Sequence, residues 1–159
     1  MSKNGIIEKR IIKRKGKIMC KAAEIGKIIV NKCLEKKIFI NTQKLQKLLV
    51  LMNIECVIET GNTLFNEDIV IWDCGVAIKE VDKEFKQYIL EFTEPLVEYI
   101  VLLEQENQII ENVLEMYGGL CASDINKLDI IATLINKYKS LDKKHITKYD
   151  ILMEYNNAS

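Results

Sequence analysis

The residues able to carry out chemistry are few and widely spaced along this sequence. His145 is the only histidine, and no hydrolase signature built on serine or cysteine accompanies it, so it is interpreted as a surface residue. The cysteines contain no Cys-x-x-Cys pair, so neither a zinc site nor a redox pair is expected. We interpret them as small, buried apolar groups in a reducing cytosol. They are Cys20, Cys33, Cys56, Cys74 and Cys121.

Carboxylate pairs do not strengthen the case for catalysis. Glu67 and Asp68 fall in an expected turn, and Glu104 and Glu106 fall on a charged helix face, so both pairs are interpreted as solvated surface. No Walker A, Rossmann or EF-hand pattern occurs. We therefore expect no catalytic residue, no bound metal and no cofactor.

One stretch stands out because it holds the only tryptophan. Trp72 is followed by Asp73 and, two residues later, by Gly75, which is expected to adopt a backbone angle closed to other residues. Two interpretations fit Trp72: a core anchor beneath a hairpin, or part of a binding surface, where tryptophan is enriched. We predict a partner-binding surface that includes Trp72, Asp73 and Gly75, with Gln46 and Lys47 nearby on a helix.

Two helices are predicted before this stretch. Apolar residues recur at helical spacing from Ala22 to about Lys36. The next helix has Asn41 or Thr42 as its cap and ends at Gly61. Its apolar positions follow the i, i+3, i+4, i+7 rule: Leu45, Leu48, Leu49 and Met52. Its other face is predicted to be polar and comprises Gln43, Lys44, Gln46 and Lys47.

Around and after the tryptophan the pattern changes. Two short extended pieces flank a turn at residues 66–68, which predicts a small hairpin. Four helices are then expected: one over residues 81–92, one capped by Thr93 with Pro95 in its first turn, one capped by Ser123 and one starting at Thr147. The predicted fold class is mainly α, a compact multi-helix domain with a small β-hairpin-like insertion near residues 62–76.

The net charge of the chain is zero, but its charged residues are unevenly distributed along the sequence. Residues 1–18 hold seven Lys or Arg and one Glu, whereas the remainder holds 16 basic and 22 acidic residues. We expect a flexible basic leader over 1–18, one helical domain over 19–155 and a loose tail over 156–159. Met19 as the true start is an alternative interpretation of the leader.

Several segments together resemble the Panacea domain, the family of SocA-like antitoxins and GepA-like phage-associated proteins. Lys44-Leu45-Gln46-Lys47-Leu48-Leu49 is similar to the family's most recognisable motif, Lys-Leu-Gln-Lys-Leu-Leu-Tyr, with Val50 at the position of Tyr. Gly75 follows Trp72 at the family's distance, and Tyr117-Gly118 begins a later matching block. The resemblance covers about residues 20–155. It implies a helical module without catalytic residues.

The resemblance implies binding and neutralisation of a cognate toxin, with delivery of that toxin to a protease as a variant of this role. The acidic body of the chain favours a basic partner. Two alternatives stay open: a phage or mobile-element accessory protein that binds a host protein, and a nucleic-acid-associated regulator that uses the basic leader. A cytoplasmic location is expected, because the sequence has no apolar run long enough to span a membrane and no signal peptide.

Overall fold

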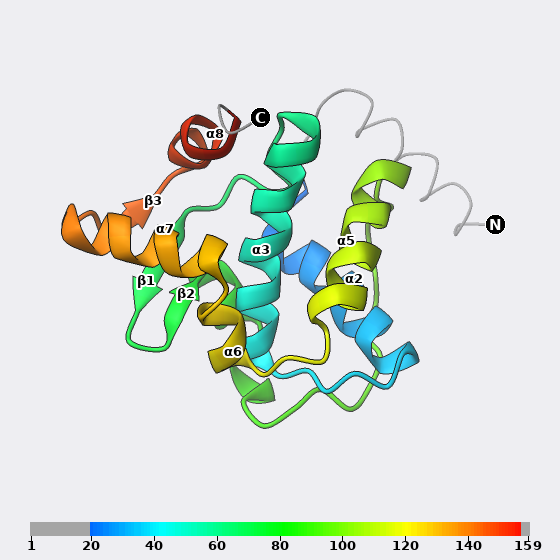
Figure 1. The fold of residues 1–159 in the computed structure, drawn as a ribbon. Coiled ribbons are helices and arrows are strands. Elements are labelled where there is room, and N and C mark those ends of the chain that lie inside the picture. Colours follow the sequence, from blue (N-terminus) through cyan, green and yellow to red (C-terminus); the bar gives the residue numbers. More distant parts are fainter. Residues whose placement is uncertain (1–19, 157–159) are drawn as a thin grey trace.

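The computed structural model describes residues 20–156, so the expected leader and most of the tail lie outside the described residues. Helices dominate this part of the chain, which confirms the predicted mainly α class (Figure 1). The helices are α2 (Ala22–Glu35), α3 (Thr42–Thr60), α4 (Lys79–Glu84), α5 (Glu104–Tyr117), α6 (Ala122–Asn126), α7 (Asp129–Ser140) and α8 (Lys148–Asn156), with a 3₁₀ turn, η1 (Lys86–Tyr88). The strands are β1 (Ile69–Trp72), β2 (Gly75–Ala77) and β3 (His145–Ile146). Within 20–156, no helix combines the length and apolar character needed to cross a bilayer.

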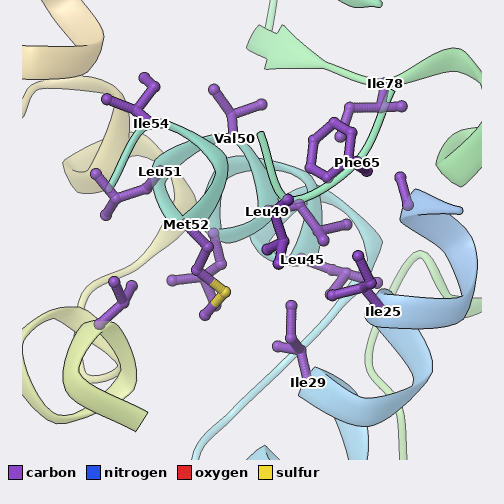
Figure 2. Packing of buried hydrophobic residues seen from close by; sticks show 14 of the residues in the cluster. Ile25, Ile29, Leu45, Leu49, Val50, Leu51, Met52, Ile54, Phe65 and Ile78 are labelled. Carbon is purple, nitrogen blue, oxygen red and sulfur yellow. The ribbon is translucent and has the colours of Figure 1, made fainter. Parts of the chain in front are cut away.

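Helix α3 lies at the centre and is contacted by α2, α4, α5, α6, α8 and β2 (Figure 1). Its ends are set by the local signals that the sequence predicts. The Asn41 side chain accepts a hydrogen bond from Lys44 N at 2.9 Å, and Gly61 adopts a left-handed conformation with φ 78°. In Figure 2, Leu45 and Leu49 lie on the side of α3 that faces α2, whereas Val50 and Ile54 project away from it. Apolar packing therefore surrounds the helix.

The predicted polar face of α3 is wrong. Lys44, Gln46 and Lys47 are only 3%, 2% and 0% exposed, and Gln43 alone of that set is exposed. Every residue of α3 from Lys44 to Ile54 is buried, so the polar side chains in this part of the helix must find partners inside the protein. The partners are backbone groups of neighbouring elements, described below.

The small sheet has the order β2-β1-β3, with both pairings antiparallel. The hairpin joins β1 to β2 through Asp73 and Cys74, so the expected turn at residues 66–68 is misplaced, although the β insertion itself is confirmed. Residues 64 and 65 do not pair with β1, because Asn53 of α3 accepts hydrogen bonds from Leu64 N at 2.7 Å and Phe65 N at 3.4 Å. A buried side chain of α3 thus holds these two residues, and Phe65 forms an isolated parallel bridge with Cys20 instead of pairing with β1.

The helix expected from Thr93 is also wrong in its first half, since α5 begins only at Glu104 and residues 93–103 lack regular structure. Asn31 of α2 prevents this segment from forming a helix. Its Nδ2 donates to Leu96 O and its Oδ1 accepts from Leu96 N, both at 2.7 Å. Both backbone groups of Leu96 are thereby withdrawn from intrahelical bonding. The helix predicted over 81–92 is likewise shortened to α4 and η1.

The C-terminal helices differ from expectation at one point and agree at another. The helix expected to start at Ser123 is divided into α6 and α7 by Leu128, whose ψ of 137° is extended, and Ser123 lies inside α6 rather than at its cap. The capping box at Thr147 is confirmed. Asp150 Oδ2 accepts from Thr147 N at 2.8 Å, and Asp150 N donates to Thr147 Oγ1 at 3.2 Å.

Candidate functional site

The turn between β1 and β2 presents two exposed side chains, Asp73 and Cys74, beside the half-buried Trp72. Trp72 and Gly75 are paired across the hairpin. Gly75 has φ 108°, which confirms its predicted conformational role. Trp72, Asp73 and Gly75 therefore lie together at one tip of the fold, with Gly75 buried; their role in binding stays a prediction.

Asn126 of α6 fixes this turn from the side, and the sequence analysis did not anticipate it. Its Nδ2 donates to Cys74 O at 2.7 Å. A Cβ built on Gly75 would lie 2.3 Å from the Asn126 side chain, so the glycine permits the close approach. The buried Asn126 Oδ1 has no hydrogen-bond partner in the described part of the chain. No local pattern around Asn126 signals this contact, since its partner lies 52 residues away.

Gln46 and Lys47 lie beneath the hairpin rather than beside it on the surface. Gln46 Oε1 accepts from Ile78 N at 2.6 Å, and Lys47 Nζ donates to Val76 O at 3.0 Å. Lys47 Nζ also lies 3.6 Å from Cys74 Sγ. Burial lowers the pKa of the Lys47 ammonium. Lys47 holds β2 and Gln46 holds the residue that follows it against α3, and both side chains are buried beneath the predicted partner-facing surface.

Lys44 also donates a hydrogen bond from its buried ammonium to a backbone carbonyl, in this case next to α5. Its Nζ donates to Gly118 O at 2.5 Å, which satisfies a carbonyl at the C-terminal end of α5, and burial lowers its pKa. The run from Lys44 to Lys47 therefore ties α3 to α5 and to β2 by three side chains. The signal available in the sequence was the continuous apolar run of residues 48–52 beside it, which leaves little of the helix for solvent.

A protein-family model described as "Antitoxin SocA-like, Panacea domain" matches residues 45–150. The chain belongs to this family. The matched span of the Panacea domain starts in α3 with Gln46 and Lys47 near its beginning, includes the whole hairpin, and ends in the first turn of α8. The predicted family is thus confirmed. No curated protein and no solved structure matches the chain significantly.

The carboxylates and the histidine of this Panacea domain have structural contacts. Glu67 Oε2 accepts from Ala22 N at 3.0 Å at the start of α2, and Glu106 Oε1 accepts from Leu103 N at 3.0 Å at the start of α5. Glu106 is only 7% exposed, so its assignment as solvated surface is wrong. His145 is exposed as predicted, and its Nδ1 lies 3.4 Å from Asp68 Oδ2. Within residues 20–156, no cluster of three or more His, Cys, Asp or Glu side chains is arranged to hold a metal ion.

The cysteines fall into two groups, so the interpretation of all five as buried is wrong for two of them. Cys20, Cys33 and Cys56 are buried, whereas Cys74 and Cys121 are exposed. Cys74 is exposed because it occupies the tip of a tight hairpin, and Cys121 because it precedes α6 in a surface connection.

Thiol labelling of the native protein should follow this division. Burial raises the pKa of Cys33 to about 11, so its reactive thiolate is scarce at neutral pH as well as inaccessible. We expect iodoacetamide to modify Cys74 and Cys121 at least about tenfold faster than Cys33, as measured by mass spectrometry of timed digests. Labelling in denaturant is the control, because all five rates should then converge. Equal native rates for Cys33 and Cys74 would contradict the structure.

Proposed function

We propose that this Panacea domain is an antitoxin that binds a toxin protein encoded beside its own gene and blocks the toxin's functional surface. The family match over residues 45–150 carries this proposal. Neutralisation by binding needs no reacting group, only a stable surface that the partner recognises. A small set of buried anchors with a polar rim is the usual energetic pattern of such surfaces.

The proposed contact surface is centred on the β1–β2 turn. Asp73 and Cys74 are exposed there, and Trp72 offers a half-buried indole at the same tip. The turn is supported by Lys47 from beneath and by Asn126 from the side. A tip held in one conformation loses little conformational entropy on binding, which favours affinity. Gln46 and Lys47 contribute to this surface as its support.

Co-expression tests the antitoxin role directly. Each gene product adjacent to this one is expressed alone and together with the protein, and colony growth and co-purification are measured. We expect one neighbour to arrest growth alone, to be tolerated in the presence of this protein, and to co-purify with it. Neighbours that are all harmless alone, or a toxic neighbour that is neither bound nor neutralised, would contradict the role.

A charge reversal tests the location of the surface. Asp73→Lys should weaken binding of the cognate toxin about tenfold or more, because a like-charged tip meets a basic partner. Glu59→Lys is a matched control: it makes the same charge change at an exposed position twelve residues beyond Lys47, about 18 Å along α3. Both variants should keep the wild-type melting temperature. Binding lost only in Glu59→Lys would move the surface to the other end of α3 while leaving the antitoxin role intact.

A further inference from the structure

The acidic residues of the chain are concentrated in one span of sequence. Residues 87–126 hold eight Asp or Glu and no Lys, Arg or His. The basic leader, residues 1–18, holds seven Lys or Arg and one Glu. The two spans therefore carry opposite charge and nearly balance each other. Coulombic attraction between such segments is strong at low salt and is screened within about 10 Å at 0.1 M salt.

Part of the acidic span, residues 94–103 together with the exposed side of α5, is here called the acidic face. A groove of about 480 Å³ runs along it, lined by α2 and by residues 98–107, with Glu35, Glu98 and Glu104 among its walls. Lys32 is the one cation among the lining residues, and its Nζ is already 2.6 Å from Glu111 Oε2. Glu35 lies near Lys36, and Glu98 Oε2 accepts from Asn31 Nδ2 at 2.8 Å, but Glu98 and Glu104 make no ion pair with any described residue.

Apolar side chains are also exposed in the segment of residues 94–103. Val97, Tyr99 and Leu103 are 65%, 49% and 45% exposed. The stretch from Val97 to Leu102 is rich in β-branched and aromatic residues, which favour extended structure. An apolar patch with a charged rim on a folded domain is typical of an interaction site.

The backbone N–H and C=O groups of this stretch are largely unpaired within the described part of the chain. Leu96 is fixed by Asn31 and Leu103 N by Glu106, but between them residues 97–102 make no backbone hydrogen bond with any other described residue. A segment that is fixed at both ends and whose N–H and C=O groups make none of these hydrogen bonds can accept a second strand or a passing chain, as the edge of a sheet can.

We propose that the basic leader, residues 1–18 of the same chain, docks on the acidic face. Its lysines and arginines are complementary to the carboxylates, and its interspersed isoleucines, Ile6, Ile7, Ile11 and Ile12, are complementary to the exposed apolar side chains. Docking removes apolar surface from water and brings opposite charges together, so both terms favour it.

The length of the leader and its point of attachment allow this docking. The described chain begins at Cys20, directly before α2, and α2 lines the groove. Eighteen extended residues reach about 60 Å, whereas the 14 residues of α2 span about 21 Å. Because the leader is tethered, its effective concentration at the groove is in the millimolar range, which a second copy or a separate partner would have to exceed.

Cross-linking of the full-length protein tests the proposal. A carbodiimide joins a lysine to a carboxylate only where the two are in contact, and peptide mass spectrometry locates the pairs. We expect links from the leader lysines, among them Lys13 and Lys15, to Glu94, Glu98 or Glu104, and their yield should fall in 0.5 M salt. A mixture of ¹⁵N-labelled and unlabelled protein should give links within one isotope only. Leader-to-carboxylate links between the two isotopes would show that a second copy occupies the face. The absence of any leader-to-carboxylate link would exclude docking of the leader. Either result overturns the proposal.

Hydrogen exchange provides an independent measurement. In the full chain at low salt, the amides of residues 97–102 should be protected, and the triple variant Lys13→Glu, Arg14→Glu, Lys15→Glu should exchange there about tenfold faster. The matched control is Lys139→Glu, Lys144→Glu, Lys148→Glu, which makes the same charge change on α7 and near the start of α8. Equal exchange in wild type and the leader variant, or equal acceleration in the control, would overturn the docking. The result does not depend on whether a toxin is found.

Discussion

Lys47→Ala should lower the free energy of unfolding by about 2–4 kcal/mol, because it removes a fully buried side chain and leaves Val76 O without its donor. The alanine also leaves a cavity between α3 and β2 that the surrounding helices fill only in part. Chemical denaturation monitored by circular dichroism measures the loss. A denaturation midpoint equal to that of the wild type would mean that Lys47 is not enclosed.

Lys47→Met separates packing from charge at the same position. Methionine keeps most of the aliphatic length, so its cost should be clearly smaller than that of alanine. Burial lowers the pKa of Lys47 below the usual 10.5, so between that lowered pKa and 10.5 the unfolded chain binds more protons than the folded one. The contribution of Lys47 to stability therefore rises with pH in that window. From about pH 7 to about pH 10, wild type should gain stability relative to Lys47→Met. A difference that shrinks with rising pH would contradict the lowered pKa.

Gly75→Ala is expected to destabilise the protein by about 2–3 kcal/mol, since φ 108° is strained for any L side chain. The added Cβ would also lie 2.3 Å from the Asn126 side chain, which must move and give up its hydrogen bond to Cys74 O. Thermal melting measures the change, and hydrogen exchange at β1 and β2 should show where it occurs.

Gly119→Ala is the matched control for this substitution. A Cβ on Gly119 meets nothing within 4 Å, so its effect should stay within about 0.5 kcal/mol. Equal melting temperatures for the two alanine variants would show that the hairpin does not require a glycine at position 75.

Local chemistry explains which parts of the fold the sequence predicts well. Asn41 and Gly61 at the ends of α3, and the Thr147 capping box at α8, act on backbone groups within a few residues, so they are recognisable without knowledge of the rest of the fold. The helix prediction for residues 93–103 fails because the deciding contact is distant in sequence. Their apolar spacing fits a helix, but Asn31, 65 residues earlier, captures the backbone of Leu96. No local pattern reports such a contact.

The role of the candidate site in binding stays a prediction, and the structure differs from the expected arrangement in the burial of Gln46 and Lys47. Trp72, Asp73 and Gly75 lie together at the hairpin tip because neighbours in sequence are neighbours in a tight turn. Gln46 and Lys47 were assigned to the same surface on the assumption that charged and amide side chains face water. That assumption fails in α3, where six other elements enclose the helix and backbone acceptors and donors replace the solvent.

Because the hairpin is supported by α3 and α6, its tip can tolerate changes of sequence. The groups that keep β2 in place come from α3 and α6. At the tip, Cys74 Sγ lies 3.6 Å from the buried Lys47 Nζ, whereas the exposed Asp73 makes no side-chain hydrogen bond or ion pair with another described residue. Position 73 is therefore free to change without a large folding cost, as long as the glycine two residues later is kept. The tip is the natural place to graft new recognition sequences or to randomise a library, with α3 serving as the constant frame.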